Sequence, residues 1–334
     1  MSSKRFPLIL TLCLLFQLTS AHAQTPSPAP PAGKPAPRPL FRDPVYDAPT
    51  DPVLCFIAEQ NKWFMYYTQR RATVTNTPGV TWVHGTHIGT AESSDGGATW
   101  TYRGEAQIAY GKDTHPDDST YWAPEVIWFE DVYHMYLTFV PGIFNDWNHP
   151  RQIVHLTSKD GVKWDTVAPL DLKSDRVIDP CVMQTPGGVW RMWYKDERKT
   201  PALSYADSPD LYQWEAKGNA VTNFSGEGPK VFHWKGKFWL IADCWANGMR
   251  VWVSDDCLNW QLQPEPLFGS HGDVVVSGDR AWWFYFGGER PPVRARRTTA
   301  INVVELSVAG GKLLPGDRDQ PTYMDLKPIR EEER

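Results

Sequence analysis

Apolar positions come in short runs from about residue 41 to residue 330, and Gly, Pro, Asp and Ser separate the runs. Many runs are rich in aromatic and β-branched residues, a composition typical of strands. We find no long stretch in which apolar residues recur with the period of a helix. The pattern therefore predicts an all-β fold built from short strands.

Five of these runs begin alike, and each is followed at a fixed distance by a second, aromatic-rich run. The distance is 13 positions in every case, from Asp51 to Phe64, Ala123 to Tyr136, Asp179 to Met192, Glu227 to Leu240, and His271 to Phe284. Repeated units of this size are typical of stacked blades. The repeats predict a five-bladed β-propeller in a single domain, residues 41–330.

The far end of four units also repeats, with the pattern Ser-x-Asp, a turn and then Trp. The four copies begin at Ser93, Ser158, Ser208 and Ser254 and end at Trp100, Trp164, Trp214 and Trp260. The Asp side chain can hold a tight turn by accepting bonds from its own downstream backbone. We predict that these Asp residues are structural and that each Trp packs between neighbouring sheets.

The first 40 residues look different from the rest. Lys4 and Arg5 precede the apolar run 6–18, and Ala21 and Ala23 flank a small-residue cleavage site, so residues 1–23 have the form of a secretory signal peptide. The apolar run is too short to span a membrane. Residues 24–40 form a Pro/Ala-rich linker that we expect to be extended. The protein is therefore predicted to be exported to the periplasm or the extracellular space.

Charge and cysteine content narrow the function classes. The formal net charge is −5 at pH 7, and the sequence has no basic cluster, so a nucleic-acid partner is not expected. Four cysteines follow the signal peptide, and we expect buried free thiols, with Cys244 and Cys257 near each other in blade four. The 17 Trp residues suit a protein that stacks sugars, although strand packing accounts for most of them.

The residues that head the first strands carry the candidate chemistry. In a propeller the first strand of each blade lines the central channel, so Asp51, Asp179, Glu227 and His271 should meet at one mouth. Glycoside hydrolysis needs two carboxyl groups, one to protonate the leaving oxygen and one to activate water or attack the sugar. A third carboxylate nearby raises the pKa of the acid.

The ordered set of motifs resembles glycoside hydrolase family 43 from about residue 43 to residue 310. The motifs are Asp51-Pro52, Tyr121-Trp122-Ala123-Pro124-Glu125, Ile178-Asp179-Pro180, Glu227-Gly228-Pro229 and Ser270-His271-Gly272. Asp-Pro alone is a common turn, but all five in order at fixed spacing are specific. The resemblance implies a five-bladed propeller and inverting release of a terminal sugar, usually arabinofuranose or xylose, from plant or algal carbohydrate.

Roles carried over from the family follow residue by residue. The resemblance implies that Asp51 is the general base, that Glu227 is the general acid, and that Asp179 raises the pKa of Glu227 and orients it. His271 matches the family's axial histidine, which often supports a calcium ion through waters. We expect no required cofactor and keep a structural calcium ion near His271 as an open alternative.

Two neighbouring residues are candidates for substrate binding. Trp122 is either a sugar-stacking wall or part of the core. Glu125 heads the inner strand of blade two one position late, which puts it on the rim or beside an arginine. Asp43, which also precedes a proline, lies outside the 13-residue register and is interpreted as a decoy.

Other functions remain open at this level. The Ser93–Trp100 turn has the form of a sialidase Asp-box, but a sialidase needs three arginines and six blades. A cluster of arginines, Arg290, Arg294, Arg296 and Arg297, is expected to form a solvated loop. Family 117, which cleaves agar-derived sugars, uses a histidine shortly before the third carboxylate, and the eight residues before Glu227 hold none. A sugar-binding propeller without catalysis is the non-enzymatic alternative.

Overall fold

The computed structural model describes residues 32–111, 119–287 and 297–328. Its strands form five successive sheets of four or five strands, which are the five predicted blades, and a small two-stranded sheet. Neighbouring strands within each blade are antiparallel, except for the short β6, which pairs in parallel with β10. The prediction of an all-β, five-bladed β-propeller is confirmed, and five blades count against the sialidase alternative.

Each blade runs along the chain from its inner to its outer strand. Blade one contains β2 (Pro49–Ile57), β3 (Lys62–Gln69), β4 (Ile88–Ser93) and β5 (Thr101–Glu105). Blade two contains β7 (Ser119–Phe129), β8 (Val132–Pro141), β9 (Gln152–Ser158) and β10 (Lys163–Pro169), with β6 (Gln107–Ile108) added at its edge.

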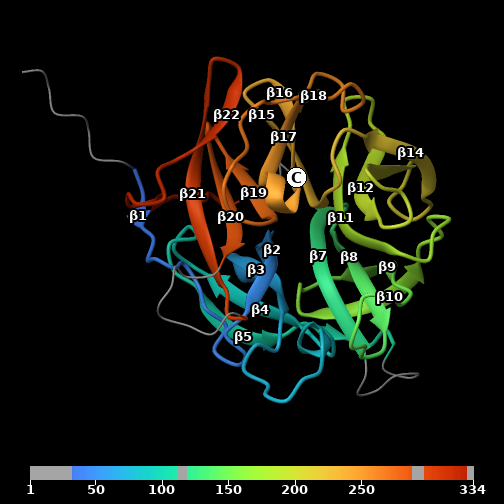
Figure 1. Ribbon diagram of the computed structural model, residues 1–334. Coiled ribbons are helices and arrows are strands. Elements are labelled where there is room, and N and C mark those ends of the chain that lie inside the picture. The colour runs from blue at the N-terminus through green and yellow to red at the C-terminus, as the bar shows by residue number, and fades with distance from the viewer. Residues whose placement is uncertain (1–31, 112–118, 288–296, 329–334) are drawn as a thin grey trace, which may run out of the picture. The chain divides into compact units, whose positions relative to one another are not determined.

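The other three blades have four strands each. Blade three contains β11 (Val177–Gln184), β12 (Trp190–Asp196), β13 (Leu203–Ser208) and β14 (Glu215–Val221). Blade four contains β15 (Glu227–Trp234), β16 (Lys237–Asp243), β17 (Met249–Ser254) and β18 (Gln261–Leu262). Blade five contains β19 (Gly272–Ser277), β20 (Arg280–Gly287), β21 (Ala300–Ala309) and β22 (Lys312–Pro315). The inner strands β2, β7, β11, β15 and β19 surround the middle of the sheet ring (Figure 1).

A bulge interrupts the inner strand of four blades at the same place. The pairing with the second strand shifts at Asp51-Pro52, Ala123-Pro124, Asp179-Pro180 and Gly228-Pro229. The residue before each proline has a positive φ, between 40° and 56°. A proline cannot donate to the ladder, and the bulge turns the preceding side chain out of the sheet plane. The bulges of blades one and three thus bring Asp51 and Asp179 to one cavity.

The predicted turn tryptophans do pack between blades. Trp164 of blade two meets Tyr66 of blade one edge-on, with ring centroids 5.8 Å apart, and Trp100 of blade one meets Phe284 of blade five at 6.5 Å. In each turn the Asp accepts a bond from a downstream backbone N–H, as Asp95 does from Thr99. This confirms the structural interpretation of the Ser-x-Asp turns.

The ends of the described chain add a feature that composition did not predict. β1 (Lys34–Pro35) pairs with β23 (Tyr323–Met324), and the Ala36 N–H donates to the carbonyl of Thr322 at 2.8 Å. The last part of the expected linker is therefore ordered on the propeller, because backbone groups bond whatever the side chain. The signal peptide and residues 24–31 lie outside the described residues.

The four cysteines that follow the signal peptide all lie in the described ranges. All four are buried, Cys181, Cys244 and Cys257 are free thiols as predicted, and Cys244 and Cys257 pack in one apolar cluster. In the ranges that the structure describes, no helix has the length and apolar character needed to cross a membrane.

Candidate active site

The three predicted acids line one cavity. It has a volume of about 310 Å³, close to the lower end of the range for small-ligand sites. We call it the mouth cavity. Its lining residues come from all five blades and from the loops beside them: Asp51, Arg70, Val83, Trp122, Trp147, Arg151, Ile178, Asp179, Glu197, Glu227, Trp245 and His271.

Asp51 lies at the bulge of blade one, in a cationic environment. Its Oδ1 lies 3.4 Å from Nε2 of His271 and 4.0 Å from Nη2 of Arg70, and Oδ2 accepts a bond from the Thr50 hydroxyl at 2.9 Å. Burial alone would raise the pKa of Asp51. The charges of His271 and Arg70, with hydrogen bonds from Thr68 and Thr50, outweigh burial and lower it. Asp51 is therefore held as a carboxylate.

Asp179 occupies the equivalent bulge of blade three but has the opposite character. Burial raises its pKa, His271 opposes that, and the nearby carboxyls of Glu227 and Asp51 raise it further, to about 7. Its Oδ2 accepts the backbone N–H of Gly228 at 3.0 Å. Asp179 thus fixes the peptide that directly follows Glu227.

Glu227 precedes the bulge of blade four by one residue. Gly228, not Glu227, takes the position that Asp51 and Asp179 hold, so the sequence spacing of 13 did not correspond to equal places in the sheet. A Cβ on Gly228 would lie 2.0 Å from Nδ1 of His271, and one on Gly226 would lie 2.9 Å from Sγ of Cys244. Close packing therefore requires the two glycines that flank this partly buried acid.

His271 heads the inner strand of blade five and faces Asp51. Its imidazole packs edge-on against Phe286, with ring centroids 5.2 Å apart. Burial lowers its pKa, but the charges of Asp51, Asp179 and Glu227 outweigh burial and raise it. A protonated imidazole pairs with Asp51 and cannot also donate a lone pair to a metal.

A calcium site needs six or more oxygen ligands. Among the described residues, no group of three His, Cys, Asp or Glu side chains is placed to hold a metal ion. The residues around His271 do not fit a divalent cation bound directly by protein atoms. The expectation of a calcium ion held through waters stays a prediction.

Trp122 lies where a wall was expected. It lines the mouth cavity, and its Nε1–H donates to the Val83 carbonyl at 2.7 Å, which fixes the ring. The Arg151 guanidinium lies 5.7 Å from the Trp122 ring centroid. The ring also belongs to an apolar cluster with Val83 and Ile178, so Trp122 is both core and lining.

Glu125 lies deeper in the channel and is not among the described residues that line the mouth cavity. Both of its carboxylate oxygens lie 3.1 Å from Nζ of Lys230, so its partner is a lysine and not the expected arginine. The Lys230 Nζ also lies 2.8 Å from Asp273. We call Glu125, Lys230 and Asp273 the channel cluster. Glu125 lies there because it is two residues beyond Ala123, the first residue of the bulge, and so about 7 Å further along the strand.

Five charged or aromatic lining residues were missed by the sequence analysis. They are Arg70, Trp147, Arg151, Glu197 and Trp245. Each lies in the loop that joins the second and third strands of its blade, where no sequence repeat marks a position. The sequence feature that could have found them is their chemistry. They are charged or aromatic residues in loops at the end of the channel where Asp51, Asp179 and Glu227 meet.

Two remaining sequence predictions concern residues away from the cavity. Asp43 is buried and accepts bonds from the Tyr67 hydroxyl and the Gln69 amide, each at 2.7 Å, so it is structural as interpreted. Arg297 donates to the Thr77 hydroxyl and lies over the Trp82 ring. Arg290, Arg294 and Arg296 lie outside the described residues.

Solved structures with this architecture include several sugar-cleaving enzymes. A thermostable family-43 glycoside hydrolase is 17% identical, with a TM-score of 0.63 over 85% of this chain and 99% of that chain. A family-43 β-1,3-galactosidase is 14% identical, with a TM-score of 0.63 over 85% and 97%. A family-43 β-xylosidase/α-arabinofuranosidase from a compost metagenome is 15% identical, with a TM-score of 0.59 over 81% and 94%. Likeness at these identities shows a shared propeller fold.

No protein-family model matches this chain, and no curated protein matches it.

Proposed function

We propose that this protein is a glycoside hydrolase that releases a terminal sugar with inversion, with Asp51 as the general base and Glu227 as the general acid. One observation carries the proposal. Three carboxyl groups that are remote in sequence, those of Asp51, Asp179 and Glu227, line a single cavity. The lowered pKa of Asp51 keeps it ionised, as a general base requires, and the Asp179 carboxylate holds the peptide that follows Glu227.

The proposed reaction follows from these environments. Asp51, kept ionised by His271 and Arg70, takes a proton from a water whose oxygen attacks the anomeric carbon. The glycosidic C–O bond breaks, and Glu227 gives its proton to the leaving oxygen. Asp179 lies near both Asp51 and Glu227, and its carboxylate accepts the N–H of Gly228, which orients Glu227. Proton exchange with solvent then restores both groups.

The substrate and the location are also proposals. The similar solved enzymes include a xylosidase/arabinofuranosidase and a galactosidase, so a terminal arabinofuranose or xylose of plant or algal carbohydrate is proposed first, with galactosides next. Export is supported by the charged, apolar and small-residue order of residues 1–23.

A panel of aryl glycosides with arabinofuranosyl, xylosyl, galactofuranosyl and galactosyl groups tests the proposal, with the product anomer followed by NMR. We expect cleavage of at least one substrate with inversion. Asp51→Asn and Glu227→Gln should each lower the rate about 10²–10⁴-fold. Retention would overturn the assignment of Asp51 as base. Full activity in both variants would overturn the site, and oligosaccharide binding without any product would favour the non-catalytic alternative.

A further inference from the structure

Two tryptophans at the mouth cavity are unusually exposed. Trp147, in the loop between β8 and β9, is 53% exposed, and Trp245, in the short 3₁₀ helix Trp245–Asn247 between β16 and β17, is 52% exposed. The other Trp side chains in the described ranges are less exposed, and both Trp147 and Trp245 line the mouth cavity. An indole left in water at a polar site is costly unless something covers it.

The backbone at Trp245 supports the same conclusion. Its φ is 51°, in the left-handed region that a bulky side chain rarely adopts. The Asp243 carboxylate accepts the Trp245 N–H at 2.9 Å and holds this conformation. A strained backbone that is held in place at a cavity marks a position with a role.

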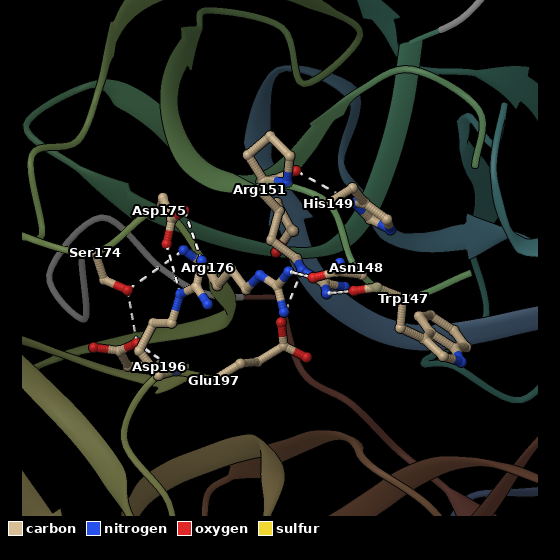
Figure 2. A network of polar contacts seen from close by, with 12 residues as sticks. Trp147, Asn148, His149, Arg151, Ser174, Asp175, Arg176, Asp196 and Glu197 are labelled. Carbon is tan, nitrogen blue, oxygen red and sulfur yellow. Dashed lines mark hydrogen bonds and ion pairs between the residues drawn. The ribbon is translucent and has the colours of Figure 1, made fainter. Parts of the chain in front are cut away.

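Arg151 fixes the loop that carries Trp147. Its side chain is only 1% exposed, its Nη2 donates to the Trp147 carbonyl at 2.6 Å, and its Nε lies 2.8 Å from Oε2 of Glu197 (Figure 2). All three residues line the mouth cavity. The buried guanidinium thus holds Trp147 and Glu197 in place at the cavity wall.

Trp245 lies on the side of the proposed acid. Asp243, two residues before Trp245, pairs with Glu227 across β15 and β16, whereas Arg70 and His271 lie against Asp51. The charges of Arg151, Glu197 and Lys195 also act on Glu227. The Lys195 Nζ also lies 5.9 Å from the Trp245 ring. Because the acid protonates the leaving oxygen, its side of the cavity is the side of the leaving group.

The charges of the cavity also select a substrate class. Of the described residues that line it, four carry carboxyl groups and two are arginines, and each arginine faces a carboxylate: Arg151 faces Glu197, and Arg70 faces Asp51. No described lining arginine is left to balance an added anion. A sugar carboxylate or sulfate would be repelled, whereas a neutral sugar would not.

We propose that Trp147, Arg151, Glu197 and Trp245 bind a neutral sugar of the leaving group, so that the natural substrate is a neutral oligosaccharide. The sugar stacks on an exposed indole, and Arg151 holds the Trp147 carbonyl and the Glu197 carboxylate in place beside it. This inference rests on the proposed function, because it uses Glu227 as the acid.

The test compares two substrates that carry the same glycone. This glycone is the sugar that the aryl glycoside panel shows the protein to release. One is the glycosyl fluoride, whose leaving group is too small to reach the tryptophans, and the other is a neutral disaccharide. Trp245→Ala and Trp147→Ala should each lower kcat/KM on the disaccharide about tenfold, or about 1.4 kcal/mol, and change the fluoride less than about twofold. Tyr212→Ala, an aromatic 49% exposed away from the cavity, is the matched control.

Binding is measured separately by calorimetry on Glu227→Gln with the same neutral disaccharide and with one that carries a uronic acid. We expect the neutral sugar to bind, Trp245→Ala to weaken it about tenfold, and the uronate to bind more weakly. Equal losses on fluoride and disaccharide, or tighter binding of the uronate, would overturn this inference and leave the proposed function intact. If the wild type hydrolyses neither substrate, the proposed function itself fails.

Discussion

The mouth cavity and the channel cluster use the same inner strands, yet they treat charge in opposite ways. At the mouth, the carboxyls of Asp51, Asp179 and Glu227 crowd together and open into a cavity. Deeper in the channel, the acids Glu125 and Asp273 enclose Lys230, with separations of 3.1 and 2.8 Å. The acids of the mouth thus face an open cavity, as the proposed chemistry requires, whereas those of the channel face a buried partner within the protein.

The channel cluster also joins every blade. The Val182 N–H of blade three donates to Glu125 of blade two at 3.1 Å, and the Leu54 N–H of blade one donates to Asp273 of blade five at 2.8 Å. Lys230 of blade four completes the set, and its two acidic partners outweigh burial and raise its pKa well above the usual value. One buried cation therefore ties five sheets around the channel.

The largest expected difference between the two regions is in rate. Glu227→Gln should lower turnover about 10²–10⁴-fold while the melting temperature changes little, because this side chain is partly exposed and makes no ion pair with another of the described residues. Glu125→Gln should leave turnover within about tenfold and lower the melting temperature. Steady-state kinetics and thermal unfolding of both variants check this. A Glu125→Gln rate as low as that of Glu227→Gln would place Glu125 in the chemistry.

The next effect is on stability. Lys230→Met leaves two buried carboxylates without their cation, which should cost about 3–5 kcal/mol in the free energy of unfolding. Denaturant unfolding measures it, with Lys237→Met as control, since its partner Asp255 is exposed. Adding Glu125→Gln and Asp273→Asn to Lys230→Met should restore most of the loss. If the triple variant is as unstable as Lys230→Met alone, the loss of charge pairing is not the cause of the instability.

The smallest effect is a pH dependence at Asp179. Its pKa is raised to about 7 in the folded protein against about 3.9 in an unfolded chain, so ionisation destabilises the fold progressively between pH 4 and 7. Asp179→Asn, which stays neutral, should therefore raise the melting temperature more at pH 8 than at pH 5. Asp279→Asn, at an exposed site, should show no such trend. A pH-independent difference would contradict the raised pKa.

Much of this architecture could be predicted because repeats mark it. The blade number, the turn tryptophans and the convergence of Asp51, Asp179 and Glu227 all follow from spacing. The one-residue offset of Glu227 was missed, although the prolines mark it: Pro229 follows Glu227 by two positions, whereas Pro52 and Pro180 directly follow their acids. Arg151, Glu197 and Trp245 lie in loops, whose path depends on neighbouring blades and not on local pattern. The pairing of Glu125 with Lys230 could not be predicted either, because it depends on how the inner strands of different blades approach one another in the channel.

The left-handed residue before each inner-strand proline has a consequence for how such sites change. Four blades share this backbone, yet the position holds aspartate twice, alanine once and glycine once. Asp51 and Asp179 both reach the mouth cavity from this position, whereas a Cβ on Gly228 would collide with His271, so the acid of blade four stands one residue earlier. The same backbone thus allows an acid in some blades and forbids any side chain in another, and the residue that heads the neighbouring strand decides which.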